Sequence, residues 1–419
     1  MTDVLPTARS YADADTHADA PLVTGLGIVA PNGLGIEAFW SAVLAGESAI
    51  GPLRRFEAGG YPSRLAAEVN LDMAALLPSR LLPQTDHVTR LSLVAAEEAL
   101  ADAALAEGTY DALDQGVVTA SSAGGFDFGH RELEKLWRQG GAYVSAYQSF
   151  AWFYAVNTGQ ISIRHGLKGP SGVLVTDAAG GLDALAQARR QLRRGSKLIV
   201  SGGVDGSICP WGWIAQQAGG RLTTSDDPAT AYLPFDDRAS GHVPGEGGAI
   251  LIVEDAASAR GRGARVYGAI AGYGASFDPH PDSGRPSALT AAIATALADA
   301  AVDPADVDVV FADGEGVPAL DAAEATAIAD TFGERAVPVT VPKTMYGRLY
   351  AGSAALDVAT ALLSIRDGLI PATVNVAPSA DSPIELVIGP PRRRRVRTAL
   401  VIARGYGGFN SALIVRAAS

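Results

Sequence analysis

The segment Val173-Leu-Val-Thr-Asp-Ala-Ala-Gly-Gly-Leu-Asp183 decides the fold, because an apolar β-branched run meets a cluster of small residues there. The helical spacing of Leu182, Leu185 and Ala186 follows, so the segment predicts a strand that turns sharply into a helix. Small side chains at such a turn let another group approach the backbone N–H groups at the helix N-terminus. In acyl-transfer enzymes the tip of this kind of turn holds the nucleophile. Here Ala178 stands at the tip and offers no nucleophilic atom.

The composition indicates a globular α/β protein. Hydrophobic residues make up 48% of the 419 residues and 48 residues are glycine, which suits a large core with many tight turns. The net charge of -12 argues against general nucleic-acid binding. The sequence has no apolar stretch long enough to span a bilayer, so no membrane partner is expected. Residues 1–20 are polar and lack the apolar middle of a secretory signal, so we expect a flexible tail on a cytoplasmic protein.

Two basic runs and one cysteine stand out against this average. Residues 189–194 and 392–395 are rich in arginine, which is typical of a solvated helix face and a charged loop. The alternative is a docking patch for an acidic partner. The only cysteine, Cys209, excludes an intrachain disulfide. It lies in the apolar and aromatic run Cys209-Pro-Trp-Gly-Trp213, so we expect a buried structural thiol.

Strands and helices alternate along the chain. The first half predicts strands at 22–28, 115–121, 197–201 and 245–254, and helices at 36–44, 88–105, 126–137 and 256–262. From about Val266 the pattern restarts, with strands at 266–273, 307–312, 337–341, 398–403 and 411–415, and helices at 288–301, 319–332 and 354–367. Such alternation predicts parallel sheets covered on both faces. We therefore expect two similar halves, residues 21–262 and 263–419, that pack as one body.

Residues 149–163 form an aromatic segment, with Phe150, Trp152, Phe153 and Tyr154 close together. Aromatic side chains bury large areas, and clusters of them are enriched in cores and interfaces. We expect this segment to be buried, either in the core or at a subunit contact.

Several segments together resemble the β-ketoacyl synthase family, which has the thiolase fold. These segments are Val23-Thr-Gly-Leu-Gly-Ile-Val-Ala-Pro-Asn-Gly33, Leu233-Pro-Phe-Asp-Asp-Arg238, Pro244-Gly-Glu-Gly-Gly-Ala-Ile250, the loop at Lys343 and Gly405-Tyr-Gly-Gly-Phe-Asn410. The resemblance runs from about residue 21 to the end and implies two similar βα halves in a layered αβαβα core. It also implies a Cys nucleophile at the turn, two His residues on loops of the second half, and a Lys that supports the second His.

This chain departs from the family at each chemical position. Ala178 occupies the place of the Cys, Asp313 that of the first His and Arg348 that of the second, whereas Lys343 is kept. None of the six His residues lies on these loops. An Arg stays protonated near pH 7 and cannot act as a general base, and a charged Asp disfavours an enolate. We therefore predict no condensing site, no cofactor and no metal site in this chain.

Two interpretations of the substituted positions remain open. We hypothesise that Asp313 and Arg348 form a salt bridge that fills the emptied site. The alternative is that each side chain has separate polar neighbours.

The combination resembles one subfamily in particular, the chain length factor or ketosynthase β subunit of bacterial type II aromatic polyketide synthases. The segments that carry this resemblance are 124–128, 149–165 and 343–350. The resemblance implies a heterodimer with an active ketosynthase α subunit, which owns the Cys, and an acyl carrier protein that carries malonyl and polyketide chains. Members usually have Gln where this chain has Ala178, a residue linked to priming decarboxylation, so its absence argues against a priming role.

The resemblance also implies a tunnel at the subunit interface whose gate lies on the helix after the Gly-Gly turn. By motif match the gate positions are Phe126, Gly129 and Leu133, which share one helix face at spacings of three and four. Shorter-chain members tend to have Thr and Phe at the last two positions, so we expect a deeper tunnel and a product of decaketide length or beyond. The alternative is that Gly129 only permits close helix packing. Three further candidates for the lining are Phe150, Cys209 and Trp211.

Three functions remain open at this point. The first is a non-catalytic β subunit that shapes the tunnel and activates its partner. The second is an active condensing enzyme with an unorthodox nucleophile such as Asp177, although the anhydride that it would form is short-lived. The third is a homodimeric binding protein on a thiolase scaffold.

Overall fold

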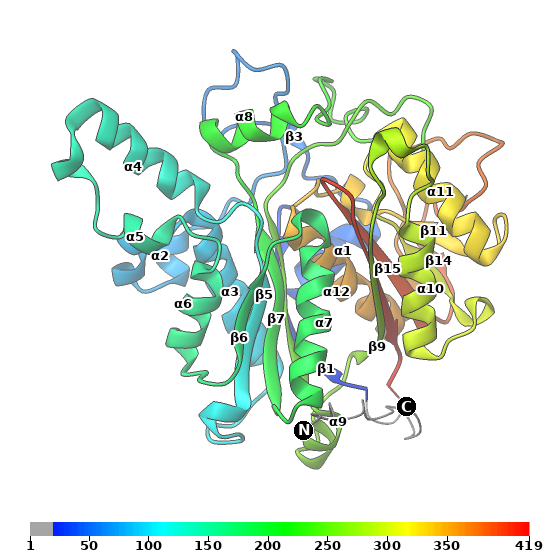
Figure 1. Ribbon diagram of the computed structural model, residues 1–419, viewed down its shortest axis with the longest axis horizontal. Helices are drawn as coiled ribbons and strands as arrows, with labels where there is room; N and C mark the ends of the chain where they lie inside the picture. The colour runs from blue at the N-terminus through cyan, green and yellow to red at the C-terminus, as the bar shows by residue number, and fades with distance from the viewer. Residues whose placement is uncertain (1–19, 419) are drawn as a thin grey trace, which may run out of the picture.

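The computed structural model describes residues 20–418, in which helices cover a large twisted sheet (Figure 1) and two further sheets have two strands each. The sheet has twelve strands in the order β13-β11-β10-β15-β16-β9-β1-β8-β7-β5-β6, and β2 pairs with β1 off this path. Of the N-terminal tail expected over residues 1–20, all but Ala20 lies outside the described residues.

The strands of the sheet fall into two sets along the chain. The first set is β1 (Leu22–Ala30), β2 (Gly33–Leu34), β5 (Gln115–Ala120), β6 (Ser171–Leu174), β7 (Leu198–Asp205) and β8 (Gly247–Glu254). The second set is β9 (Gly268–Phe277), β10 (Val309–Phe311), β11 (Pro338–Thr340), β13 (Glu385–Leu386), β15 (Thr398–Gly405) and β16 (Phe409–Arg416). The two sets meet where β1 pairs with β9.

Strand directions repeat from one set to the other. From the junction outward, β1–β8 and β8–β7 are antiparallel, and β7–β5 and β5–β6 are parallel. In the same order, β9–β16 and β16–β15 are antiparallel, and β15–β10 and β10–β11 are parallel. The expectation of purely parallel sheets is therefore wrong, because the central strands pair antiparallel. The shared pattern supports two similar halves.

The helices form three layers around the strands. α7 (Gly180–Arg193) and α12 (Ala351–Asp367) pack on each other and contact strands of both sets, so they make the central layer. α3 (His87–Asp102) covers β1 and β8, and α10 (Leu289–Ala300) covers β9 and β16 (Figure 1). The result is the layered αβαβα core of the thiolase fold.

A close backbone approach occurs at the same place in both halves. A Cβ atom on Gly27 of β1 would lie 1.8 Å from the carbonyl oxygen of Ala95 on α3. A Cβ atom on Gly274 of β9 would lie 2.1 Å from the carbonyl oxygen of Ala292 on α10. Only glycine lets strand and helix come this near, so the sequence of each half fixes its outer layer at this contact.

The remaining elements are shorter or lie outside the layers. They are α1 (Ile36–Ala45), α2 (Met73–Leu76), α4 (Phe126–Gln139), α5 (Gln148–Ala151), α6 (Val156–His165), α8 (Pro210–Ala218), α9 (Ala256–Gly261), α11 (Pro318–Phe332) and the short strands β3 (Gly51–Pro52), β4 (Leu65–Ala66), β12 (Leu369–Ile370) and β14 (Arg392–Arg393). In Figure 1, α4 projects from the body of the molecule as an arm. We did not expect α6 or α8 from the sequence.

The aromatic side chains of residues 149–163 are not part of the core, although Ile161 of the same segment is. Trp152, Phe153 and Tyr154 are exposed, with 43% of Trp152 accessible, and Phe150 is only half-buried. The core interpretation is therefore wrong for the aromatic side chains and right for Ile161, whereas the subunit contact stays a prediction.

Other expectations have mixed outcomes. Cys209 is buried, as predicted, but Arg189 is also buried, where it pairs with Asp299 and donates to the carbonyl of Ala271. Arg189 therefore stabilises the packing of α7 and is not part of a solvated face or a docking patch. Arg392 and Arg393 form β14, which pairs with β12, instead of a loop.

Of the helices in residues 20–418, none has the length and apolar character needed to cross a membrane.

Candidate functional site

The expected turn is present at the N-terminus of α7. β6 ends at Leu174, residues 177–179 form one short 3-10 turn, and α7 begins at Gly180. Asp177 has a φ of 51°, a left-handed conformation that is strained for a residue other than glycine. A Cβ atom on Gly181 would lie 2.6 Å from the carbonyl oxygen of Ala351, so glycine is required where α7 and α12 meet. The turn therefore presents Ala178, which is 4% exposed, at the end of the central layer.

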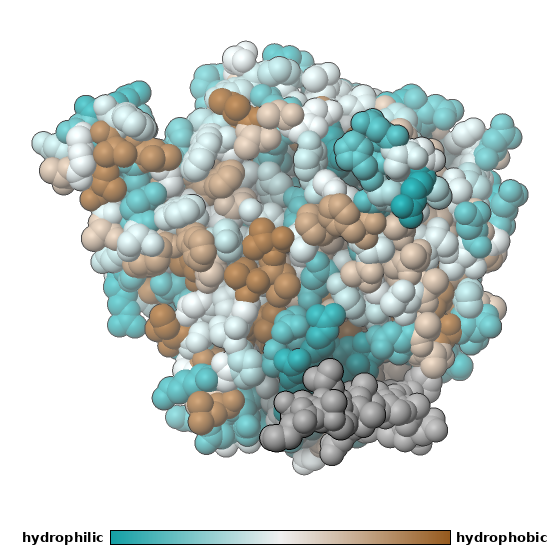
Figure 2. Space-filling view, viewed as in Figure 1, coloured by the Kyte–Doolittle hydropathy of each residue, from teal (hydrophilic) through white to brown (hydrophobic). Residues whose placement is uncertain are grey.

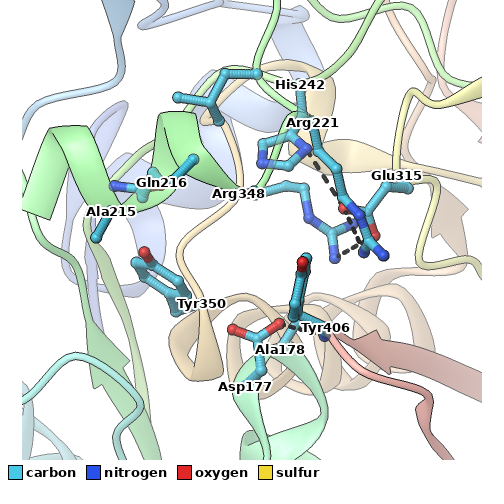
Figure 3. A pocket seen from close by; sticks show the side chains of 13 residues that line it. Asp177, Ala178, Ala215, Gln216, Arg221, His242, Glu315, Arg348, Tyr350 and Tyr406 are labelled. Atoms are coloured by element: carbon cyan, nitrogen blue, oxygen red, sulfur yellow. Dashed lines mark hydrogen bonds and ion pairs between the residues drawn. The ribbon is translucent and has the colours of Figure 1, made fainter.

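A cavity of about 410 Å³ opens above this turn, and we call it the elbow cavity. Its chemistry comes from residues of both halves (Figure 3): Asp177, Ala178, Arg221, His242, Glu315, Arg348, Tyr350 and Tyr406. The backbone N–H of Tyr406 donates to the Asp177 carboxylate at 2.7 Å. None of the residues that line the cavity is a Cys, Ser or Thr. The lining therefore offers neither a thiol nor a primary or secondary alcohol as a nucleophile.

Arg348 and Asp313 form a buried two-point ion pair, which confirms the predicted salt bridge. Arg348 Nη1 lies 2.9 Å from Asp313 Oδ2, and Nη2 lies 3.2 Å from Oδ1. Nη2 also lies 3.3 Å from Glu315 Oε2, and the guanidinium donates to the carbonyls of Asp313 and Arg404. Because its donors are used within the protein, Arg348 closes this side of the cavity.

The electrostatics agree with this geometry. Burial lowers the pKa of Arg348, but Asp313 and Glu315 outweigh burial and hold that pKa well above its usual value. Burial raises the pKa of Asp313, yet Arg348 brings it below the usual value. Burial keeps the pKa of Glu315 raised. The arginine and Asp313 are therefore both charged, so they cannot exchange protons near neutral pH as a pair of imidazoles would.

Lys343 has partners that do not depend on a His. Its Nζ pairs with Asp357 and donates to the carbonyl of Ala312 at 3.0 Å. Tyr346 donates to the other Asp357 oxygen at 3.0 Å. The retained lysine is thus part of a buried polar network beneath the Asp313 loop.

His242 is a cavity residue that we did not predict. Its Nδ1 lies 3.5 Å from Glu315 Oε1, and burial followed by the charge of Arg348 lowers its pKa to about 3. His242 lines the same cavity as Asp177, although it lies outside the loops that carry Asp313 and Arg348. Its place depends on tertiary contacts, since the N–H of Gly241 donates to the Gly316 carbonyl and the N–H of His242 donates to the Arg221 carbonyl.

Arg221 is a second cavity residue that sequence reasoning missed. Its guanidinium lies 4.6 Å from the ring centre of Tyr406 and 3.4 Å from Glu315 Oε1. Arg221 therefore links Tyr406 to the ion pairs around Arg348.

Some of the predicted gate residues meet, but away from the elbow cavity. The ring of Phe126 stacks on that of Trp211, with ring centres 4.7 Å apart. A Cβ atom on Gly129 would lie 3.4 Å from both Trp152 and Trp211. Leu133 is half-buried on the same helix. Phe126, Gly129 and Trp211 therefore form one aromatic cluster with Trp152.

The other two lining candidates stand apart from this cluster in their contacts. Phe150 packs edge to face with Tyr147, with ring centres 5.9 Å apart. Cys209 accepts a hydrogen bond from the Gly212 N–H at 3.4 Å, and burial raises its pKa to about 12. None of the six gate and lining candidates lines the elbow cavity.

Metal ligands are not gathered in the part of the chain that the structure describes. Within residues 20–418, no group of three or more His, Cys, Asp or Glu side chains is placed to hold a metal ion. The buried carboxylates near the elbow cavity are instead bonded to arginine, lysine and backbone N–H groups.

The sequence matches two domain families and many relatives. The β-ketoacyl synthase N-terminal domain matches residues 21–259 and the C-terminal domain matches residues 267–377. The chain is 58% identical over 399 residues to the actinorhodin polyketide putative β-ketoacyl synthase 2 of Streptomyces coelicolor, covering 94% of this chain and 98% of the relative. It is 61% identical over 404 residues to the tetracenomycin polyketide synthase ketoacyl synthase β subunit of Streptomyces glaucescens, covering 95% and 99%.

Two solved structures share the fold. The first is a type II polyketide synthase acyl carrier protein in complex with its ketosynthase bound to the hexaketide, with 26% identity, a TM-score of 0.86, and coverage of 96% of this chain and 100% of that chain. The second is the ishigamide ketosynthase/chain length factor, with 26% identity, a TM-score of 0.84 and the same coverage.

Proposed function

The chain belongs to the β-ketoacyl synthase family, among its type II polyketide β subunits, and from this premise we propose that it is the non-catalytic subunit of a heterodimer that sets polyketide chain length. The observation that carries the proposal is the elbow cavity. Ala178 stands at the nucleophile position, and Arg348 and Asp313 are locked together at the positions of the two imidazoles. A cavity that offers no thiol or alcohol, and whose arginine and aspartate are held as a charged pair, favours a role through shape and contact.

We propose an active ketosynthase α subunit as the partner, and β6 with its surroundings as the contact. β6 is the last strand of the sheet, so one edge of it is open to pairing. Five apolar side chains near this edge are exposed: Trp152, Phe153, Tyr154, Ile163 and Val175. Figure 2 shows hydrophobic side chains gathered over this region and on the α4 arm. Exposed apolar side chains gathered in one region are typical of a protein contact surface.

We propose that the further partner is an acyl carrier protein that supplies malonyl and polyketide chains. This proposal is supported by a relative, the solved complex of a type II polyketide acyl carrier protein with its ketosynthase. We also propose a cytoplasmic location, and a division of the chain into a tail (1–20) and two halves (21–262 and 263–419). The repeated strand directions support the division.

We propose that Phe126, Gly129 and Leu133 form the gate face of α4 and limit the length of the product. Gly129 supports this, because a Cβ atom there would just touch both the Cβ atom of Trp152 and the ring of Trp211, at 3.4 Å from each. The small residue leaves room that a larger side chain would fill, and close-packed surfaces resist compression. We therefore propose a product of decaketide length or beyond. We propose Trp211, which stacks on Phe126, as an additional lining residue, and we keep Phe150 and Cys209 as further candidates, although their contacts lie outside this cluster.

The test of the subunit role is reconstitution from purified proteins. The chain alone, supplied with malonyl-loaded acyl carrier protein, should form no carbon–carbon bond and no acyl adduct. Addition of an α subunit should give polyketide. Condensation by the chain alone would support the unorthodox nucleophile Asp177, and a stable homodimer indifferent to the α subunit would support the binding protein. The bond between Asp177 and the Tyr406 N–H argues for the first outcome.

The gate has its own test in the same system. The double variant Gly129→Thr/Leu133→Phe fills the space beside Trp152 and Trp211, so the products should become shorter, as mass spectrometry of the released chains would report. The matched control is Glu134→Phe, which adds the same ring to α4 on an exposed position. An unchanged length distribution in the double variant would remove α4 as the gate.

A further inference from the structure

The gate face begins at a helix end that does not cap itself. The first backbone N–H groups of a helix have no partner within the helix and need one from outside. The residue before α4 is Gly125, which has no side chain to accept from them. A buried carboxylate from elsewhere supplies the missing acceptor, because the N–H of Phe128 donates to Asp86 Oδ2 at 2.7 Å.

The same carboxylate caps a second helix. Asp86 is the N-cap residue of α3, and its Oδ1 accepts from the Val88 N–H at 2.8 Å. One oxygen thus serves each helix, and the side chain is almost fully buried, since only 1% of Asp86 is exposed. α3 belongs to the outer layer of the core, whereas α4 forms the projecting arm (Figure 1). The side chain of Asp86 therefore connects the first turn of α4 to α3 through one hydrogen bond to each helix.

The loop in front of α4 is held separately. The carboxylate of Asp205 accepts from the N–H of Ser122 at 2.5 Å and from that of Ala123 at 3.4 Å. A Cβ atom on Gly125 would lie 2.0 Å from the carbonyl oxygen of Ala151, so the loop is packed tightly on its other side. These contacts fix where α4 starts. The bond from Phe128 to Asp86 joins the first turn of α4 to the N-terminus of α3, beside the stacking of Phe126 on Trp211.

We infer that Asp86 is a positioning residue for product length, because its bond to the first turn of α4 sets where Phe126 and Gly129 stand. The inference rests on the proposed role of α4 as the gate. Asp86 touches no substrate and acts through the helix. A change in the direction of α4 moves Phe126 relative to Trp211, and so alters the room at the gate without altering any gate side chain.

Two variants separate this role from the capping of α3. In Asp86→Asn the amide nitrogen cannot accept a hydrogen bond, so one of the two helix ends loses its cap in either orientation of the side chain. In Asp86→Ser the hydroxyl can cap α3 locally, as serine does at N-cap positions, but it is too short to serve Phe128 as well. The matched control is Asp72→Asn, because Asp72 caps the exposed helix α2 by the same type of bond, from the Ala74 N–H at 3.0 Å.

The experiment measures the distribution of product lengths per mole of purified heterodimer. For Asp86→Ser and Asp86→Asn, the ratio of the main product to its neighbours in length should fall about five-fold, which is the change in population that one lost helix cap produces. Asp72→Asn should keep the wild-type ratio. A purely structural role for Asp86 would lower the yield of heterodimer and leave the ratio per mole unchanged, and that result would overturn the inference.

A second measurement covers variants that assemble poorly. Hydrogen exchange in the full chain should become faster at residues 126–130 in Asp86→Ser, while the first turn of α3 stays protected. Equal protection of residues 126–130 in the wild type and the variant would overturn the inference. If Asp86→Ser changes the ratio but Gly129→Thr/Leu133→Phe does not, the gate has been misplaced on α4. If only the Gly129/Leu133 variant changes it, the gate stands and the role of Asp86 fails.

Discussion

At the scale of the residue, Arg348 has the largest predicted effect on stability. Its guanidinium is buried between Asp313 and Glu315, so Arg348→Met would leave two buried carboxylates without their main cation. Breaking a buried pair in this way costs about 3–5 kcal/mol. Urea unfolding should report a loss of this size. Arg138→Met, which breaks the exposed pair with Glu134 on α4, should change stability by less than about 0.5 kcal/mol. A similar loss in both variants would contradict the prediction.

His242 should make the stability of the protein depend on pH. Burial and Arg348 lower its pKa to about 3 in the folded state, against about 6.5 in an unfolded chain. The unfolded ring therefore binds a proton first as the pH falls. The contribution of the neutral ring to stability is complete above about pH 6.5 and is lost as the pH falls from there toward 3.

His242→Phe removes this contribution. Its free energy of unfolding should change less between pH 6.5 and pH 4 than that of the wild type, as urea unfolding at several pH values would show. His280→Phe serves as the control, because the His280 side chain is 77% exposed. A wild-type pH slope in His242→Phe would refute the assignment.

The sequence predicted part of this site. Opposite charges at Asp313 and Arg348, on two loops that the family places at one site, were enough to predict their salt bridge. His242 and Arg221 were missed because no local pattern marks them. The loop at Gly241 is held at the cavity by tertiary contacts, among them the bond of its N–H to Gly316, which lies in the other half of the chain.

At the scale of the element, the contact between a strand glycine and the backbone of the covering helix should make both halves sensitive to a larger side chain at that glycine. Gly27→Ala and Gly274→Ala each place a Cβ atom against a backbone carbonyl oxygen of the covering helix, which cannot move aside cheaply. We expect each to lower the free energy of unfolding by about 3 kcal/mol or more, at the upper end of over-packing costs. Gly51→Ala has open space around its Cβ position and should be nearly neutral. Tolerance of either core substitution in thermal unfolding would count against this packing.

Strong periodicity made most helices and strands predictable, and the exceptions have physical causes. α6 and α8 were missed because glycine, threonine, proline and tryptophan interrupt their helical pattern, and tertiary contacts decide their conformation. The antiparallel pairing of β1 with β8 was missed because alternation along the chain does not specify strand direction. The long connection from β1 to β8 spans most of the first half, so the pairing is set by the whole fold.

At the scale of the whole molecule, the open edge at β6 should carry the contact with the partner. Ile163→Asp puts a charge on the exposed apolar surface beside β6. Burial of that unpaired carboxylate should weaken the heterodimer about tenfold or more, since a factor of ten needs only about 1.4 kcal/mol. The control is Ile388→Asp. Ile388 is exposed and follows β13, at the opposite end of the sheet, so this variant should bind the partner with unchanged affinity. Analytical ultracentrifugation of the two mixtures would compare them, and equal affinities would place the contact elsewhere.

The closed charge network around Arg348 also bears on whether this chain could regain catalysis. A lone Ala178→Cys substitution would place a thiol at a helix N-terminus, where it could accept an acyl group but would find no imidazole at Asp313 or Arg348 to continue the reaction. Arg348→His alone would leave the buried carboxylate of Asp313 without its arginine, and Asp313→His alone would leave the buried guanidinium of Arg348 without its aspartate. Each single substitution therefore gives either a protein that holds an acyl group without elongating it or a protein of lower stability. Only several simultaneous substitutions could give a condensing site.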